Sequence, residues 1–89
     1  MGLTLRDLNP QQLRRLAVKY GVRVEGVANG PAYRAGVRKG DVILQIDGQP
    51  MRSAVQMSAY LAHAPKDRPL PMLVRRGASA LFLALRIHE

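Results

Sequence analysis

The sequence predicts an α+β fold: a small, partly open β-barrel or sandwich of five to six mostly antiparallel strands with two main helices. Three observations support this fold. The length of 89 residues suits one domain, so residues 1–89 are expected to form a single unit. Short apolar segments alternate with turns rich in Gly, Pro and Asp, as in mixed strand-rich folds. Two further segments carry a helix-capping residue followed by apolar residues at helical spacing.

The amino-terminal part predicts a strand, a helix and a second strand. Leu3–Leu5 is expected to form a short strand. Asn9 is a good N-cap and Pro10 a good first helical residue, so a helix of about ten residues is expected, with Gly21 ending it. Residues 22–28 alternate valine with other side chains and predict the next strand.

The central segment, residues 27–48, is the most informative part of the chain. Asn29-Gly30-Pro31 breaks the preceding strand, and Pro31 is well placed to begin a helix. Ala32–Ala35 would make one helical turn, and Gly36 can take the left-handed conformation that ends it.

Two turns then frame a buried strand. Gly40-Asp41 predicts the first turn and Asp47-Gly48 the second. The strand between them, residues 42–46, is strongly apolar.

The carboxyl-terminal part predicts the second main helix and a hairpin. Ser53 is expected to cap a helix that runs through Ala64. Residues 65–71 are punctuated by proline and predict a loop. Strands are expected over 72–75 and 80–87, joined by a turn.

Composition excludes several classes of protein. There is no Cys, so no disulfide or thiolate metal site holds the fold. No apolar run approaches the roughly 18 residues needed to span a membrane, and no signal peptide is recognisable. The net charge is +8, but the basic residues are scattered and only one Phe and three Tyr could stack on bases. We therefore expect no nucleic-acid partner.

The central segment resembles the PDZ family. The matching elements are Gly30-Pro31-Ala32, Ala35-Gly36-Val37, Gly40-Asp41 and Asp47-Gly48, although the Ser that usually precedes the Pro is missing. The strand and helix ahead of this segment resemble the circularly permuted bacterial type. Within that type the whole chain is most similar to the second PDZ domain of HtrA/Do-like (DegP-type) periplasmic serine proteases.

This resemblance implies a peptide-binding module excised from a longer periplasmic protein, in which Met1 is either native or a cloning start. Its partners would be peptide C-termini or exposed hydrophobic segments of unfolded envelope proteins, and an upstream protease domain with which it helps regulate or assemble the protease. The isolated domain is expected to be a monomer. The alternatives are a PDZ module of a site-two-type membrane protease, of a C-terminal processing protease or of a secretion component. A less favoured alternative is a basic nucleic-acid-binding domain.

By the family pattern, the amino terminus supplies a carboxylate loop and a groove strand. Met1-Gly2-Leu3 has the form apolar-Gly-apolar, and Gly2 permits a conformation that turns N–H groups toward an anion. Leu3 would line the pocket for the last ligand residue. The expected pairing residues of the groove strand are Thr4, Leu5 and Arg6.

The resemblance places the helix that follows Ser53 across the groove. Ala54, Ser58 and Leu61 would face the ligand, whereas Met57 is expected in the core. The common eukaryotic class has His at the position of Ala54, which hydrogen-bonds the ligand. Ala54 cannot do so, and this predicts an apolar preference and low selectivity.

Basic residues near the expected groove would favour an anionic terminus or an acidic peptide. They are Arg6, Arg52 and the loop from Lys66 to Arg68.

Catalytic and metal-binding chemistry is not expected of this chain. His63 and His88 have no third ligand at metal spacing. Of the serines, Ser53 resembles a cap, Ser79 lies in a turn, and none sits on a strained glycine elbow. We therefore predict no catalytic residues, no metal and no cofactor, while the parent protein would be a serine endopeptidase.

Overall fold

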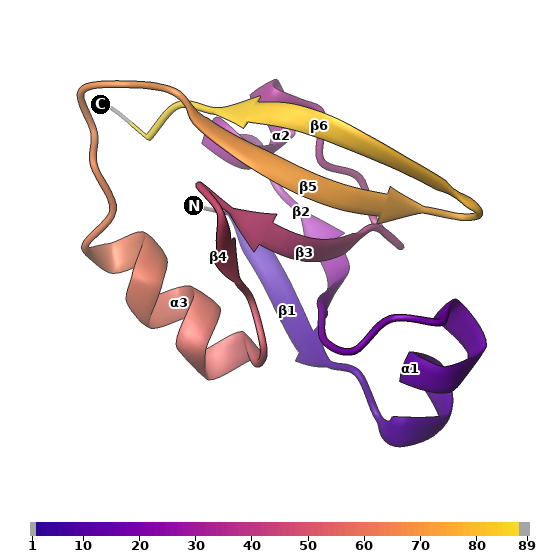
Figure 1. Cartoon of the computed structure of the whole chain (residues 1–89). Coiled ribbons are helices and arrows are strands. Elements are labelled where there is room, and N and C mark those ends of the chain that lie inside the picture. Colours follow the sequence, from indigo (N-terminus) through magenta and orange to yellow (C-terminus); the bar gives the residue numbers. More distant parts are fainter. Residues whose placement is uncertain (1, 88–89) are drawn as a thin grey trace.

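The computed structural model describes residues 2–87 and has the predicted α+β architecture (Figure 1). Six strands pair antiparallel, and three helices connect or flank them in this part of the chain. In order, the elements are β1 (Leu3–Asp7), α1 (Pro10–Leu16), β2 (Val22–Val27), α2 (Pro31–Ala35), β3 (Val42–Ile46), β4 (Gln49–Pro50), α3 (Ala54–Ala62), β5 (Leu70–Arg76) and β6 (Ser79–Leu85).

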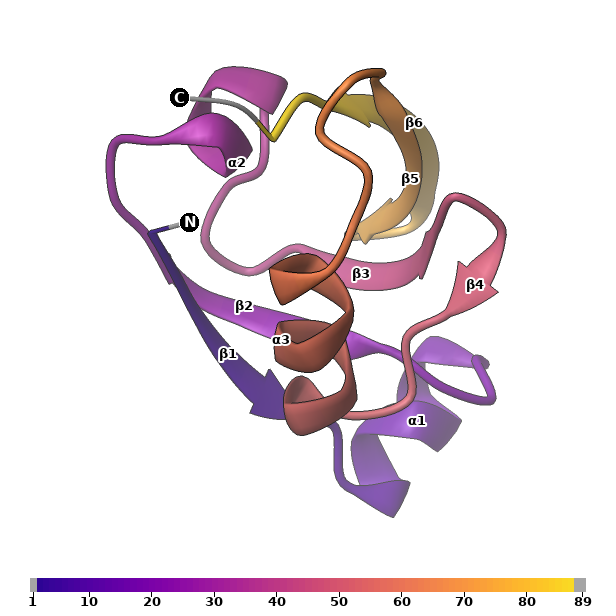
Figure 2. The same ribbon diagram turned by 90° about the vertical axis from the view of Figure 1, so that its left-hand side faces the viewer.

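The strands form one curled sheet in the order β1-β2-β3-β5-β6, with β4 paired to β3. In Figure 2, α3 lies in front of the sheet, and α2 lies near the end of β6. The helices and the sheet enclose one hydrophobic core, to which the strands other than β4 contribute apolar side chains. Its fully buried members are Val22, Val24, Ala32, Val37, Ile43, Ile46, Met51, Met57, Leu70 and Val74. None of the helices within residues 2–87 is long and apolar enough to cross a membrane.

Helix α1 begins as predicted but ends earlier. Asn9 and Gln12 form a reciprocal capping box at its start. Ala17 takes a left-handed conformation, with φ of 58°, and its N–H donates to Arg14 O over 3.1 Å. The prediction that Gly21 ends this helix is therefore wrong. Gly21 is needed for close packing instead, because a Cβ there would lie 2.7 Å from Val42 Cγ1.

The central segment follows its prediction closely. Pro31 begins α2, and Gly36 ends it with φ of 105°. Strand β3 has the predicted bounds. Asp47 and Gly48 both have positive φ, 53° and 79°, as a tight hairpin turn requires. The turn pairs β3 with β4, a two-residue strand that the sequence did not predict because it is short and contains proline.

The carboxyl-terminal elements differ from prediction at their ends. The Ser53 hydroxyl caps α3 by accepting from Gln56 N over 3.0 Å, as predicted. The helix ends at Ala62, whereas Ala64 is buried in the core beyond it. Strand β5 begins at Leu70, inside the predicted loop, because the Leu70 side chain is fully buried. Strand β6 begins at Ser79 and ends at Leu85 rather than at Ile87.

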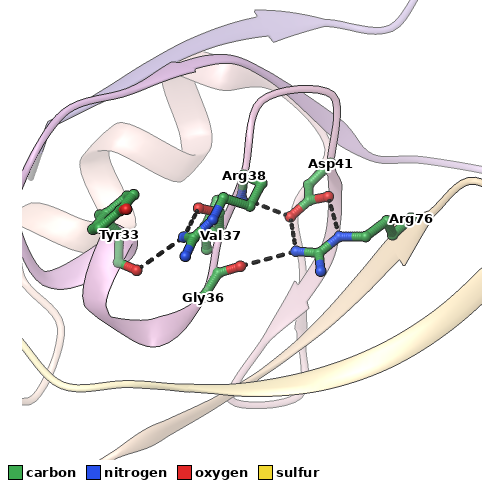
Figure 3. A network of polar contacts seen from close by, with 6 residues as sticks. All are labelled: Tyr33, Gly36, Val37, Arg38, Asp41 and Arg76. Carbon is green, nitrogen blue, oxygen red and sulfur yellow. Dashed lines mark hydrogen bonds and ion pairs between the residues drawn. The ribbon is translucent and has the colours of Figure 1, made fainter.

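A buried carboxylate joins the α2–β3 turn to the end of β5 (Figure 3). Asp41 is only 1% exposed. It accepts hydrogen bonds from Arg38 N at 2.9 Å and from Arg76 Nε and Nη2 at 2.8 and 2.7 Å. The same Nη2 atom also donates to Gly36 O at 2.9 Å. The aspartate of the Gly40-Asp41 turn thus links two segments that are distant in the sequence.

The ionised form of Asp41 is favoured in the folded state. Burial by itself would raise the pKa of Asp41, but hydrogen bonds from Arg76 and from the backbone N–H of Arg38, together with the arginine charges, lower it below its ordinary value of 3.8. A depressed pKa contributes stability that is present above the unfolded value and is lost as pH falls through the folded value. The Asp41 contribution should therefore disappear in acid.

We predict that Asp41→Asn lowers the free energy of unfolding at pH 7 by about 2 kcal/mol or more, because an amide cannot satisfy three donors as a carboxylate does. Urea denaturation from pH 7 down to pH 2.5 measures this. The difference in the free energy of unfolding between wild type and variant should shrink as pH falls below about 4.

Asp47→Asn is the matched control, because Asn also tolerates the positive φ of that turn. Asp47 pairs with Arg68 at 2.7 Å near the surface, where the ion pair contributes less. An equal decrease in the free energy of unfolding at pH 7 in the two variants would contradict a larger contribution from Asp41.

Candidate peptide-binding site

Strand β1 lies at one edge of the sheet. It pairs antiparallel with β2, from Leu3 opposite Val27 to Asp7 opposite Val22. In the sheet formed by residues 2–87, no strand pairs with its other side. An edge of this kind presents N–H and C=O groups that an additional extended chain can pair with.

A bulge in β2 accompanies this pairing. The register shifts between Thr4 and Leu5, so that Glu25 is an extra residue on the partner strand. The Glu25 carboxylate lies 3.5 Å from Arg6 Nε and 3.1 Å from Arg23 Nε. Arg6 is therefore already paired with an acid of the neighbouring strand.

The start of β1 has the backbone conformation that its glycine allows. Gly2 has φ of +82°, and its carbonyl accepts from Ala28 N over 2.7 Å. A Cβ at this position would lie 3.1 Å from Ala28 O and 3.3 Å from Asn29 O. Gly2 is thus suited to a tight loop. Met1, the first residue of the predicted carboxylate loop, lies outside the described residues.

The side chains of β1 divide between two environments. Leu3 and Leu5 are half-buried and pack against the core. Thr4 and Arg6 are exposed. The apolar members of the predicted groove strand therefore face inward, toward the region that α3 covers.

Helix α3 runs beside β1, and the first turn of the helix meets the end of the strand (Figure 2). The contact is a hydrogen bond from Ala54 N to Asp7 Oδ1, of 2.6 Å. Ala54 is half-buried at the margin of the core, and Ser58, one turn later, is exposed. Leu61 is 9% exposed and belongs to the core.

The structure thus brings the predicted strand and helix residues to one side of the molecule. Met57 is fully buried, as predicted. Asp7 was missed by the sequence analysis, since nothing local indicates a contact with a residue 47 positions away. His88 lies outside the described residues. Within residues 2–87, no three His, Cys, Asp or Glu side chains gather as metal ligands do.

The basic residues expected near this site are largely engaged elsewhere. Arg68 forms a bidentate pair with Asp47, at 2.7 and 3.2 Å. The Arg52 guanidinium lies 4.9 Å from the centre of the Tyr20 ring. The charge of Arg68 is thus offset by Asp47, and the Arg52 side chain is held against an aromatic ring.

An unpaired edge strand beside a helix, on a curled antiparallel sheet, is an arrangement to which an extended peptide can add as a further strand. A family model described as "PDZ domain" matches residues 22–76, and the chain belongs to this family. The resemblance predicted from the glycine turns is therefore confirmed.

Curated relatives match the chain over its full length. A "Probable periplasmic serine endoprotease DegP-like" of Pseudomonas putida is 35% identical over 89 residues, covering 100% of this chain and 19% of the relative. A protein of the same name from Halomonas elongata is 34% identical over 90 residues, with the same coverage. The chain spans about a fifth of the length of these relatives.

Solved structures with bound peptides have the same fold. The HtrA3 PDZ domain bound to a phage-derived ligand superposes with a TM-score of 0.81, at 28% identity, over 97% of this chain and 81% of that one. A variant of the HtrA-type protease AlgW with a decapeptide gives a TM-score of 0.87, also at 28% identity. The match covers 96% of this chain and 27% of that one.

We predict that Gly2→Ala loosens the start of β1, because the new methyl group would crowd Ala28 O in a backbone conformation that costs an L-residue about 1 kcal/mol. The amide of Ala28, which donates to Gly2 O, should exchange with solvent about five to ten times faster. Gly48→Ala is the control, since φ there is similar, +79°, but no atom lies within 4 Å. Unchanged exchange at Ala28 in Gly2→Ala would contradict this account.

Proposed function

We propose that this chain binds extended peptides by strand addition to β1, with α3 as the opposite wall of the binding groove. The observation that carries the proposal is the unpaired side of β1 next to α3 in residues 2–87. A ligand running antiparallel to β1 completes the backbone ladder, and its alternate side chains turn toward the helix. The related HtrA structures that contain peptide ligands support peptide binding by this fold.

The ligand terminus would lie at Gly2. The positive φ of Gly2 suits a loop whose N–H groups, those of Gly2 and Leu3, face a carboxylate. Leu3 and Leu61 would line the pocket for the last side chain. The pairing backbone belongs to Thr4, Leu5 and Arg6, and Met1 would complete the loop.

Selectivity would be low. Ala54 and Ser58 present short side chains toward the ligand, and Ala54 offers no side-chain hydrogen bond. Main-chain pairing is insensitive to sequence, so the preference is for apolar residues in general. Because few ligand side chains are anchored, a short peptide should bind with a Kd on the order of micromolar or weaker.

The parent protein, in this proposal, is a periplasmic HtrA-like serine endopeptidase, as the names of the relatives indicate. The module would capture C-termini or exposed hydrophobic segments of unfolded envelope proteins and help regulate or assemble the protease. The match to DegP-like relatives over the whole of this chain favours this parent over a site-two-type or a C-terminal processing protease.

We predict that Leu3→Asp weakens binding of an apolar C-terminal peptide at least about tenfold, because a charge would replace the apolar wall of the terminal pocket. NMR titration of the labelled domain measures this. In the wild type, shifts should concentrate on Gly2 to Arg6 and on Ala54 to Leu61. Binding by Leu3→Asp at wild-type strength would place the groove elsewhere.

Val55→Asp is the matched control, since it adds the same charge to α3 at a side chain that is 80% exposed. It should bind as the wild type does. The titration is repeated at about 50 and 200 mM salt, because charge-driven binding to a polyanion falls by orders of magnitude over that range, whereas apolar groove binding changes little.

A further inference from the structure

Strand β6 is the other free edge of the sheet. It ends the strand order at the side opposite β1, and within residues 2–87 it pairs only with β5. Figure 1 shows it along the top of the molecule, away from β1 and α3. A contact made through this edge is therefore separate from the proposed peptide groove.

The turn before β6 shows which of its backbone groups are unpaired. Gly77 and Ala78 form a two-residue turn, so Arg76 and Ser79 on either side of it are a hydrogen-bonded pair. Hydrogen bonding alternates along an antiparallel strand, and every second residue after Ser79 therefore also bonds to β5. The residues between them direct their N–H and C=O groups away from the sheet. These are Ala80, Phe82 and Ala84.

Natural edge strands carry features that discourage further pairing, and β6 lacks those that β1 has. Strand β1 contains Arg6 and Asp7, and its pairing with β2 is bulged. Strand β6 pairs with β5 in unbroken register, and residues 77–85 include no charged side chain and no proline. Phe82, at the middle of the strand, is 73% exposed. The free edge of β6 is thus open to a further apolar strand.

The sequence of β6 reads the same in both directions around Phe82, since residues 80–84 are Ala-Leu-Phe-Leu-Ala. When two copies of β6 pair antiparallel about a two-fold axis at Phe82, each alanine meets an alanine and each leucine a leucine. Each outward-directed residue then donates one hydrogen bond to the second copy and accepts one. Phe82 faces Phe82 of the second copy, at a Cα separation of about 5.5 Å that lets the two rings pack together.

A recess beside the end of β6 leaves room for the second copy. It has a volume of about 340 Å³ and lies between α2 and the end of the strand. The residues that line it are Pro31, Arg34, Ala35, Ala84 and Arg86. In the two-fold arrangement, the part of the second copy that passes this recess is residues 78–80, which are Ala-Ser-Ala. The second copy thus places only small side chains beside α2.

We propose that two copies of this chain associate through β6, as a two-fold antiparallel pair centred on Phe82. The interface is the same surface on both copies, as a closed dimer requires, and the β1 edge of each copy stays free. The contact is small and two chains of net charge +8 repel each other, so we expect a Kd on the order of 100 µM. Well below that concentration the chain would be the monomer expected from its sequence. This inference goes beyond the proposed function and does not depend on it.

Sedimentation equilibrium of the whole chain, from about 10 µM to about 1 mM and in about 300 mM salt to screen the repulsion, tests this proposal. The apparent mass of the wild type should rise from that of one chain toward that of two. Phe82→Lys should weaken association at least about tenfold, because the ring contact is lost and two like charges meet at the axis. Val55→Lys is the matched control, since it adds the same charge at a side chain that is 80% exposed. Its Kd should stay within about twofold of the wild-type value.

Cysteine cross-linking tests the register, because the chain has no cysteine of its own. In Phe82→Cys the two thiols meet at the axis, with their Cα atoms at a separation that a disulfide bridges. In Ala80→Cys, also an exposed position, each thiol lies four positions along the strand from the other, about 13 Å away. Under mild oxidation, Phe82→Cys should form the disulfide dimer at least about tenfold faster than Ala80→Cys.

Four results would overturn the proposal. They are a wild type that stays monomeric up to about 1 mM, association that Phe82→Lys leaves unchanged, equal cross-linking rates in the two cysteine variants, and growth of the apparent mass beyond two chains. NMR shifts of residues 80–84 when an apolar peptide is added to dilute wild type would assign the edge to an extended ligand instead of a second copy. None of these results bears on the β1 groove, which the peptide titration of Leu3→Asp tests separately.

Discussion

The fold depends on the burial of one carboxylate between two segments that are distant in sequence. Asp41 holds the α2–β3 turn through Arg38 N and the end of β5 through Arg76. A buried charge is tolerated only where donors surround it, so the turn and β5 must meet in this one arrangement. Strand β3 follows directly and is the centre of the sheet, pairing with β2, β4 and β5. The Asp41 contacts thus fix the strand on which all the others are assembled.

The free edge of β1 follows from the order of strands around β3. Strand β2 pairs with β3 along one side and with β1 along the other. Strand β1 comes last in this order and pairs only with β2 within residues 2–87. Packing then brings α3 beside this edge, because Met57 and Leu61 are part of the core under β1 and β2. Burial of the apolar face of α3 is therefore what supplies the opposite wall of the proposed groove.

Sequence alone predicted the elements whose signals are local. Proline at the start of α2, Gly36 at its end and Asp47-Gly48 after β3 are conformational requirements of single residues, and the structure has all three. The end of α1 could not be predicted, because Ala17 takes a left-handed conformation with no glycine to indicate it. The contact of Asp7 with α3 was missed for a related reason, since it joins residues that only the folded chain brings together.

The two ends of β1 are built differently from its middle. At one end a glycine is required by φ of +82° and by the nearness of Ala28 O, and at the other a carboxylate caps a helix. Helix α3 has short side chains in its first two turns, with Ala54 at the Asp7 end of the strand and Ser58 one turn later. Specific chemistry is thus concentrated where a ligand would begin and end, and the middle relies on backbone pairing. The residue-specific contacts of β1 therefore lie at its two ends, whereas backbone pairing along its free edge would be insensitive to sequence.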